Sequence, residues 1–244
     1  MTQPVWIGYD PGTPGGNVGV TRIGPHTLYQ ADAYHLRPRL GFFDAEVMDP
    51  PYIIRTQGGG SFRKHRPYLD QIQQEGLDRG FDHTIINPLL CGSVVVFCHN
   101  DQVPGVSAYL DGLFHRFALC IWKKLTPMPV ANKHYVPELE LYFHAWNRGY
   151  HPAGELADLK RVVECRSRAL KDYGHPTVKP DEVMTKILRN VAGKTVIDPF
   201  MGTGSTGVAA IREGKIFTGI EHNPKHYATA VTRIAAAWGQ SQGE

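Results

Sequence analysis

The sequence predicts an α/β fold, with a mostly parallel, twisted sheet and helices on both of its faces. Three observations support this prediction. From residue 180 to the C-terminus, helix and strand patterns alternate, which is typical of parallel strands joined by helices. A glycine-rich loop, residues 202–207, lies between a strand pattern and a helix pattern. The length of 244 residues and the hydrophobic content of 42% suit one well-packed core, so we expect residues 1–244 to form a single domain.

The N-terminal half mixes irregular and regular patterns. The first 25 residues are rich in glycine and proline, which predicts short strands or an irregular loop. Residues 43–48 predict a strand that ends at Asp49-Pro50, because paired prolines cannot continue inside a sheet. Further along we expect a polar helix at 68–77, a buried strand at 93–98, a helix at 106–114, and strands at 118–122 and 139–145.

The C-terminal part is more regular. Residues 146–174 are polar with weak periodicity, which predicts an inserted surface segment. A helix begins at Pro180-Asp181, where proline and an acid favour a first helical turn. Its buried face is predicted to hold Val183, Ile187, Leu188 and Val191. A strand at 195–197, a helix at 205–212, a strand at 216–220 and a helix at 224–237 complete the chain.

Composition and local patterns disfavour membrane, secreted and metal-binding proteins. The net charge of +3 does not by itself indicate a nucleic-acid partner. The longest apolar runs are strand-sized, and the N-terminus lacks a secretory signal, so we expect a cytoplasmic protein. The four cysteines show no C-x-x-C spacing, and His83, His99, His115, His134 and His144 show no H-x-x-x-H or H-E-x-x-H pairing, so no metal site is expected. Four aromatic residues are expected to pack the sheet: Tyr135, Tyr142, Phe143 and Trp146.

The glycine loop allows more than one interpretation. Gly202, Gly204 and Gly207 follow a strand and open a helix, so backbone N–H groups are available to a ligand. Glu221 ends the next strand, where a carboxylate accepts hydrogen bonds from two ribose hydroxyls. This pattern suits NAD(P) or S-adenosylmethionine, and it also suits a tight turn without a ligand.

Companion motifs separate these interpretations. Three segments stand out: Asp49-Pro50-Pro51-Tyr52, Asp198-Pro199-Phe200 before the glycine loop, and His175-Pro-Thr177-Val-Lys179-Pro180. Together they resemble the motifs of S-adenosylmethionine-dependent DNA amino-methyltransferases. That family methylates N6 of adenine or N4 of cytosine. The motif order, tetrapeptide first and cofactor loop last, resembles its permuted β class. The resemblance implies a Rossmann-like methyltransferase fold with a circularly permuted motif order.

The resemblance covers residues 28 to about 237 and includes departures. Residues 28–33, with Asp32, are similar to the stretch whose acid contacts the adenine of the cofactor, although Ala31 replaces the usual glycine. Trp122-Lys123, Tyr135-Val-Pro and Glu140–Phe143 are also similar to family segments. The segment where the family carries its target-recognition region, about 146–174, is short here.

The tetrapeptide has the groups that this chemistry needs. An exocyclic amine is a poor nucleophile, because its lone pair is delocalised into the ring. The Asp49 carboxylate and the Pro50 carbonyl, held by the rigid Pro50-Pro51 segment, are two acceptors that localise this lone pair and orient the amine. Tyr52 is expected to stack on the flipped-out base, which would offset the cost of flipping by about 1–3 kcal/mol.

The resemblance also implies the binding residues. The residues expected to hold the cofactor are Asp32, Ala33, His175, Thr177, Lys179, Asp198, Phe200, Gly202, Thr203, Gly204, Ser205, Thr206, Glu221 and His222. The residues expected to contact double-stranded DNA are Arg55, Arg63, Lys64 and Arg66, in a mobile basic loop at about 55–66, together with Lys123, Arg166 and Arg168.

The prediction is therefore a DNA methyltransferase that acts on adenine N6 in a bacterial or phage-infected cell. Aspartate rather than serine at position 49 favours adenine, and N4 of cytosine is the nearest alternative. An NAD(P) oxidoreductase would leave Asp49 to Tyr52 unexplained. An inactive DNA-binding homologue is disfavoured by the intact Asp49, Tyr52, Asp198 and Glu221. The short recognition segment is compatible with a homodimer.

Overall fold

The protein forms one ten-stranded sheet. The computed structural model describes residues 5–9, 17–53, 79–127, 135–166 and 179–243. The strand order is β1-β2-β3-β10-β9-β4-β5-β7-β6-β8. The strands are β1 (Val5–Tyr9), β2 (Asn17–Ile23), β3 (His26–Gln30), β4 (Phe43–Met48), β5 (Cys91–Cys98), β6 (Arg116–Lys124), β7 (Leu139–Trp146), β8 (Val162–Cys165), β9 (Thr195–Asp198) and β10 (Ile216–Glu221). The helices are α1 (Ala33–Leu36), η1 (Arg37–Arg39), η2 (His83–Ile85), η3 (Asn100–Gln102), α3 (Val103–Leu113), α4 (Asp181–Asn190), α5 (Ser205–Arg212) and α6 (Pro224–Ser241).

Five central strands, β3, β10, β9, β4 and β5, run parallel. Their carboxyl ends therefore lie at one edge of the sheet, which is where ligands bind in open α/β sheets. β7 is antiparallel to both β5 and β6. This arrangement brings the start of β7 to the same edge as the end of β5, because Leu141 pairs with Cys98.

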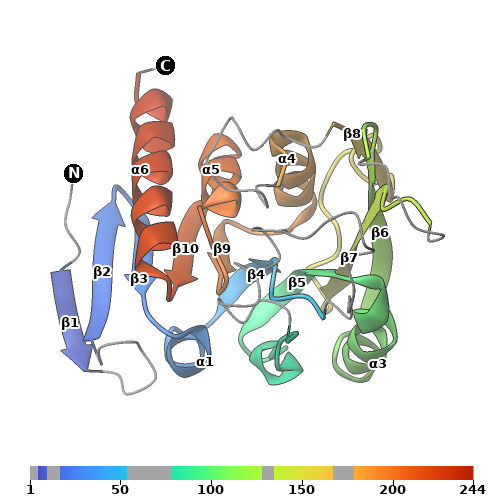
Figure 1. The fold of residues 1–244 in the computed structure, drawn as a ribbon, viewed down its shortest axis with the longest axis horizontal. Coiled ribbons are helices and arrows are strands. Elements are labelled where there is room, and N and C mark those ends of the chain that lie inside the picture. The colour runs from blue at the N-terminus through green and yellow to red at the C-terminus, as the bar shows by residue number, and fades with distance from the viewer. Residues whose placement is uncertain (1–4, 10–16, 54–78, 128–134, 167–178, 244) are drawn as a thin grey trace, which may run out of the picture.

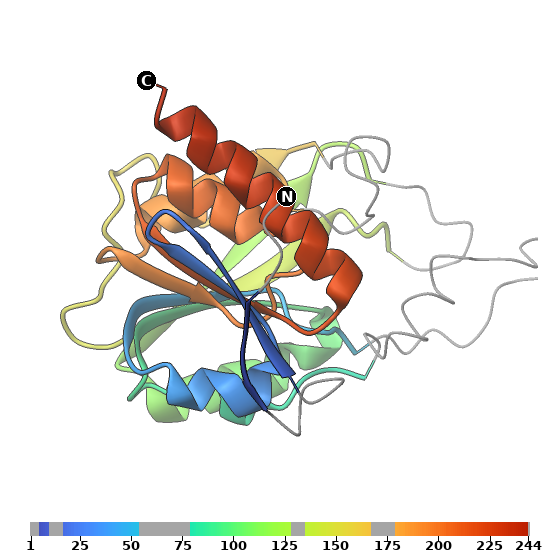
Figure 2. The same ribbon diagram turned by 90° about the vertical axis from the view of Figure 1, so that its left-hand side faces the viewer.

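Helices cover both faces of the sheet, as predicted. α4, α5 and α6 lie on one face, and α1 and α3 lie on the other (Figures 1 and 2). Two hydrophobic clusters fill the space between the sheet and these two helical layers. The four apolar residues predicted for the buried face of α4, Val183, Ile187, Leu188 and Val191, are all buried. No helix among the described residues has the length and apolar character needed to cross a membrane.

A buried ion pair joins α1 and η1 to the sheet. Arg37 and Glu46 are 1% and 0% exposed, and Arg37 Nη2 lies 3.2 Å from Glu46 Oε2. The same guanidinium donates to the carbonyls of Gly41, at 3.0 Å, and Leu90, at 2.9 Å. Burial raises the pKa of Glu46 to about 7, although Arg37 acts to lower it. Arg37 therefore connects three separate chain segments at a single point.

The structure confirms most predicted elements and corrects others. The strand at 43–48 and the helix at 205–212 have the predicted bounds. Of the two alternatives for the first 25 residues, short strands are confirmed where the chain is described, because β1, β2 and β3 extend the sheet as an antiparallel meander. Part of the segment predicted as a surface insertion is also in the sheet, since β8 pairs in parallel with β6. The helix predicted at 68–77 lies outside the described residues.

The prediction that Tyr135 packs against the sheet is wrong. Tyr142 and Phe143 are buried in β7, as expected, whereas Tyr135 is 99% exposed. Tyr135 precedes the strand, so the alternation that buries Tyr142 does not extend to it. The four cysteines have free thiols. Among the described residues, no group of three or more histidine, cysteine, aspartate or glutamate side chains is arranged to hold a metal ion.

Candidate active site

Three acids gather at the carboxyl edge of the sheet. Asp49 follows β4, Asp198 ends β9, and Glu221 ends β10. These strands are neighbours in the order β4, β9, β10, so the three carboxylates come from adjacent positions although they are far apart in the sequence. Asp198 and Glu221 are buried, whereas the side chain of Asp49 is 29% exposed.

The tetrapeptide that begins at Asp49 is held by its own side chains and by its neighbours. The Tyr52 hydroxyl donates to Asp49 Oδ1 at 2.7 Å. Gln102, at the end of η3, donates from Nε2 to the Pro51 carbonyl at 3.2 Å. Burial raises the pKa of Tyr52, and the negative charges of Asp49 and Glu140 raise it further, so Tyr52 is a neutral phenol that donates. The catalytic carboxylate predicted from the sequence thus has a defined orientation.

Lys179 contacts the same carboxylate. Its Nζ lies 2.6 Å from Asp49 Oδ2 and 3.1 Å from Glu140 Oε2, and it donates to the Tyr52 hydroxyl at 3.3 Å. The ammonium also lies over the rings of Phe97 and Tyr52, 4.8 and 5.5 Å from their centroids. Burial acts to lower the pKa of Lys179, but the charges of Asp49 and Glu140 outweigh it and raise the pKa. Lys179 is therefore a buried cation that lies between two carboxylates.

Two glycines of the loop have different surroundings: Gly202 borders open space, and Gly207 is closely packed. Gly202 has φ of 50°, and a Cβ built there meets nothing nearer than the Phe200 carbonyl at 4.0 Å. A Cβ on Gly207 would lie 2.6 Å from Ile234 and 2.7 Å from Phe217. Gly207 thus lets α5 pack against α6 and β10, while Gly202 borders open space at the turn. That open space is what a ligand bound to this loop would require.

Two carboxylates fix the loop. Asp198 Oδ1 accepts from the Phe200 N–H at 2.9 Å, and Oδ2 accepts from the Thr206 hydroxyl at 2.5 Å. Glu221 Oε2 accepts from the Gly202 N–H at 3.0 Å. Burial raises the pKa of Asp198 to about 8; the hydrogen bonds from Thr206 and Phe200 oppose this shift, and the charges of Asp49 and Glu221 add to it.

The residues predicted for the adenine end of a cofactor lie beside this loop. Asp32 caps α1 by accepting from the Tyr34 N–H at 2.8 Å, and the Ala31 N–H donates to the Glu221 carbonyl at 3.2 Å. The Tyr34 and Phe200 rings meet edge to face, with centroids 6.0 Å apart. β3 and β10 are adjacent strands in which Gln30 pairs with Glu221, so Asp32 follows two residues after that pair at the same edge of the sheet.

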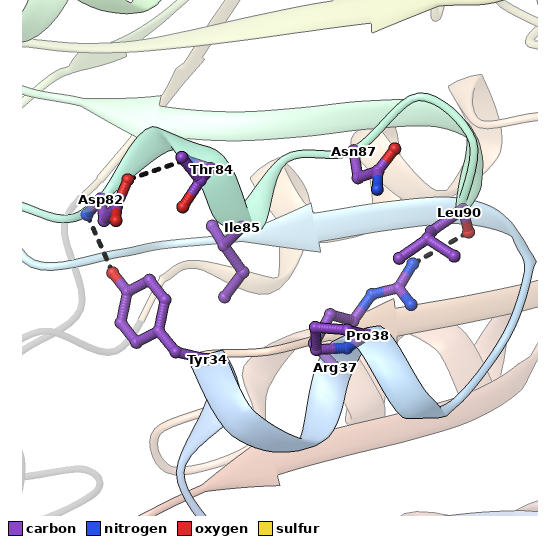
Figure 3. A pocket seen from close by; sticks show the side chains of 8 residues that line it. All are labelled: Tyr34, Arg37, Pro38, Asp82, Thr84, Ile85, Asn87 and Leu90. Atoms are coloured by element: carbon purple, nitrogen blue, oxygen red, sulfur yellow. Dashed lines mark hydrogen bonds between the residues drawn. The ribbon is translucent and has the colours of Figure 1, made fainter. Parts of the chain in front are cut away.

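A cavity of about 360 Å³ lies on the other side of Tyr34, between α1, η1 and the segment around η2 (Figure 3). The Asp82 N–H donates to the Tyr34 hydroxyl at 2.9 Å across its rim. Its lining residues are Tyr34, Arg37, Pro38, Asp82, Thr84, Ile85, Asn87 and Leu90. None of them belongs to the tetrapeptide or to the glycine loop, so this cavity is distinct from the edge where the three acids meet.

The other predicted residues divide into four groups. Thr203, Ser205 and Thr206 lie at the N-terminus of α5, where the cofactor prediction needs them. Lys123 is exposed and pairs with Glu164 at 2.8 Å, and Arg166 is exposed just after β8. Ala33 is buried, and His222 is exposed with Nδ1 3.4 Å from Glu221 Oε1. Seven predicted residues lie outside the described residues: Arg55, Arg63, Lys64, Arg66, Arg168, His175 and Thr177.

Sequence reasoning missed the roles of Glu140 and Gln102. Both contact the tetrapeptide or its lysine partner, yet they lie on β7 and η3, far from it in the sequence. Glu140 lies in a segment that is similar to the family, but nothing in the local sequence pattern pairs it with Lys179. Lys179 was predicted to hold the cofactor, and the structure places its ammonium on Asp49.

Comparisons with known proteins identify the family of this chain. Residues 43–232 match the sequence profile of a family described as DNA methylase, of the N6/N4 type. The chain is 38% identical over 64 residues to the type II methyltransferase M2.DpnII of Streptococcus pneumoniae, a match covering 25% of this chain and 24% of that protein. It is 37% identical over 88 residues to the DNA adenine methyltransferase YhdJ of Escherichia coli (strain K12), covering 34% of this chain and 28% of that protein. These matches span about a quarter of the length of both relatives.

The fold is also similar to solved structures. The M1.HpyAVI–SAM complex superposes with a TM-score of 0.60 at 25% identity, over 84% of this chain and 98% of that chain. The cytosine-N4-specific PvuII DNA methyltransferase superposes with a TM-score of 0.60 at 15% identity, over 90% of this chain and 93% of that chain. The second likeness concerns the fold alone.

Proposed function

Since this chain belongs to the N6/N4 DNA methylase family, we propose that it transfers a methyl group from S-adenosylmethionine to N6 of a flipped-out adenine in duplex DNA. The observation that supports this function best is the position of Asp49, directly beside the strand that leads into the glycine loop. A carboxylate acceptor and a cofactor loop on neighbouring strands bring amine and methyl donor together.

The cofactor fits the edge of the sheet that holds the three acids. We assign Glu221 to the ribose and Asp32 to the adenine, and the open space beside Gly202 supports a ligand at this loop. Asp198 provides negative charge for the methionine end. When bound, S-adenosylmethionine supplies a methyl group that its sulfonium already activates.

The tetrapeptide prepares the amine for transfer. Asp49 and the Pro50 carbonyl accept the two N–H groups of the amine, which localises its lone pair and directs it toward the methyl donor. Tyr52 offers its ring to the flipped base, and its hydroxyl holds Asp49 Oδ1 at 2.7 Å. The amine needs no strong base before attack, because its proton becomes acidic only after methylation.

Adenine is favoured over cytosine as the target base. Position 49 is aspartate rather than serine, and one relative, YhdJ, is named a DNA adenine methyltransferase. N4 of cytosine is the second candidate, because the matched family is of the N6/N4 type. We assign DNA contacts to Lys123 and Arg166, and to the basic residues Arg55, Arg63, Lys64, Arg66 and Arg168 outside the described residues.

The test is direct identification of the modified base. Unmethylated DNA is incubated with the protein and S-adenosylmethionine, digested to nucleosides and analysed by mass spectrometry, while a second aliquot is sequenced to map the position. We expect N6-methyladenine in a fixed sequence context. N4-methylcytosine would establish the second candidate, and the absence of any methylated base would contradict both.

Cofactor affinity is expected to increase with pH up to about 8. Burial raises the pKa of Asp198 to about 8, and the positive charges of S-adenosylmethionine favour the ionised carboxylate, so binding lowers this pKa. Below pH 8 binding therefore releases a proton, and affinity rises by up to about tenfold per pH unit between about pH 6 and pH 8. Calorimetry in buffers of different ionisation enthalpy measures both the affinity and the proton released.

Asp198→Asn is the control for this prediction. The amide removes the titrating group, so the variant is expected to bind more weakly with an affinity that no longer depends on pH over this range. An unchanged pH dependence in Asp198→Asn would assign the proton to another group.

A further inference from the structure

The contact between Lys179 and Asp49 conflicts with the charge that develops during methyl transfer. In that reaction the N–C bond forms as the C–S bond breaks, sulfur keeps the electron pair, and the positive charge passes from sulfur to the amine. A lysine ammonium 2.6 Å from Asp49 Oδ2 would lie beside this new cation and use the same acceptor. We propose that the Lys179 ammonium occupies the position of the target amine on Asp49 until the base enters. The ammonium then moves from Asp49 to Glu140. This inference rests on the proposed function.

The ammonium imitates the target amine in position and in chemistry. It presents N–H donors to the Asp49 carboxylate, as an exocyclic amine would. It also lies over the Tyr52 ring, the surface assigned to the flipped base. A base stacked on Tyr52 with its amine on Asp49 would compete with Lys179 for both contacts. Base entry therefore requires that Lys179 move.

Glu140 is the acceptor toward which the Lys179 ammonium moves. Its Oε2 is buried and lies 3.1 Å from Lys179 Nζ, but among the described residues no donor makes a well-directed hydrogen bond to it. Its other oxygen, Oε1, pairs with Lys124 at 2.7 Å. Burial acts to raise the pKa of Glu140, yet Lys179 and Lys124 lower it, so the carboxylate is ionised. A small movement of Nζ would complete the bond to Oε2 and release Asp49 Oδ2.

Glu140 is thus a positioning residue, which acts on the reaction through Lys179. It comes from β7, whose first residues lie at the catalytic edge because Leu141 pairs with Cys98 of β5. Phe97 closes the other side of the ammonium, with its centroid 4.8 Å from Nζ. Lys179 therefore has two anionic partners and little freedom elsewhere, and removing one partner strengthens its hold on the other.

The decisive experiment is a double-mutant comparison of Glu140→Gln, Lys179→Met and the two combined. Glu140→Gln leaves Lys179 with Asp49 alone, so we expect KM for DNA to rise about tenfold, with weaker flipping reported by 2-aminopurine at the mapped target position. In the Lys179→Met background the same Glu140→Gln change is expected to alter KM less than about twofold. Lys194→Met, an exposed lysine at the opposite edge of the sheet, is the matched control and should match the parent.

Two outcomes would overturn the proposal. If Glu140→Gln raises KM equally with lysine or methionine at position 179, Glu140 does not act through Lys179. If Lys179→Met lowers kcat without changing KM or the 2-aminopurine signal, Lys179 only orients Asp49 for catalysis.

A measurement without DNA separates this proposal from the proposed function. Thermal unfolding of Asp49→Asn, Lys179→Met and their combination gives the Asp49–Lys179 coupling in the protein alone. The proposal requires non-additive changes in melting temperature, and additive changes contradict it. A parent protein that methylates no base contradicts the proposed function, whatever this coupling is.

Discussion

Asp49→Ala is expected to lower kcat for methyl transfer at least about 100-fold, while the affinity for S-adenosylmethionine changes less than about threefold. Alanine removes one of the two acceptors that localise the lone pair of the amine. It also removes the partner of the Tyr52 hydroxyl, at 2.7 Å, and of the Lys179 ammonium, at 2.6 Å. Single-turnover methylation of DNA measures the first quantity, and calorimetric titration of the cofactor measures the second.

Asp49→Asn is the matched variant for this prediction. Its amide keeps the size and one acceptor oxygen, so we expect an activity between that of the parent and that of Asp49→Ala. Circular dichroism spectra of both variants check that the fold is retained. If Asp49→Ala methylates DNA as fast as the parent, Asp49 is not the catalytic carboxylate.

Arg37→Met is expected to lower the free energy of unfolding by about 3–5 kcal/mol at pH 8, because a buried carboxylate loses its counter-charge. Glu46 is fully buried, and the carbonyls of Gly41 and Leu90 lose a donor in the same change. Denaturant unfolding followed by fluorescence measures the loss. This site lies away from the three acids, so the predicted effect concerns stability rather than chemistry.

The loss in Arg37→Met should shrink as the pH falls. Burial already raises the pKa of Glu46 to about 7 with Arg37 present, and removing the guanidinium raises that pKa further. A carboxyl with a raised folded-state pKa contributes stability below its unfolded pKa and loses that contribution as the pH rises through the folded value. The penalty is therefore largest above about pH 7 and smallest near pH 5, where Glu46 is protonated.

The double variant Arg37→Met, Glu46→Leu is the control. With no buried charge left, it should recover most of the stability at pH 8. A loss in Arg37→Met that is independent of pH and persists in the double variant would mean that packing around Arg37, rather than charge, holds this region together.

Local patterns predicted the elements that depend on short segments of chain. The strand at 43–48 ends at Asp49-Pro50 because proline cannot continue the ladder, and the helix at 205–212 begins after glycines with φ of 50° and 86°. The apolar spacing of α4 predicted its buried face correctly. These features follow from steric and periodic properties of neighbouring residues, which a sequence states directly.

Pairings between distant strands were not accessible in the same way. β8 joins the sheet through parallel pairing with β6, and its weak periodicity resembles that of a surface segment because Val162 and Glu164 are exposed and only Cys165 is buried. β1 and β2 extend the sheet beyond β3, although glycine and proline surround them. Such pairings depend on which edges the rest of the fold leaves open, so local composition does not determine them.

Contiguous residues were enough to predict the family, the parallel α/β core, and the tetrapeptide and loop that we assign to the chemistry. The surroundings of Asp49, by contrast, follow from tertiary contacts. Lys179 and Glu140 come from separate segments of chain, and they meet at Asp49 because β7 inserts antiparallel beside β5. An ion pair depends on distances of a few ångströms between side chains, and those distances exist only once the whole sheet is assembled.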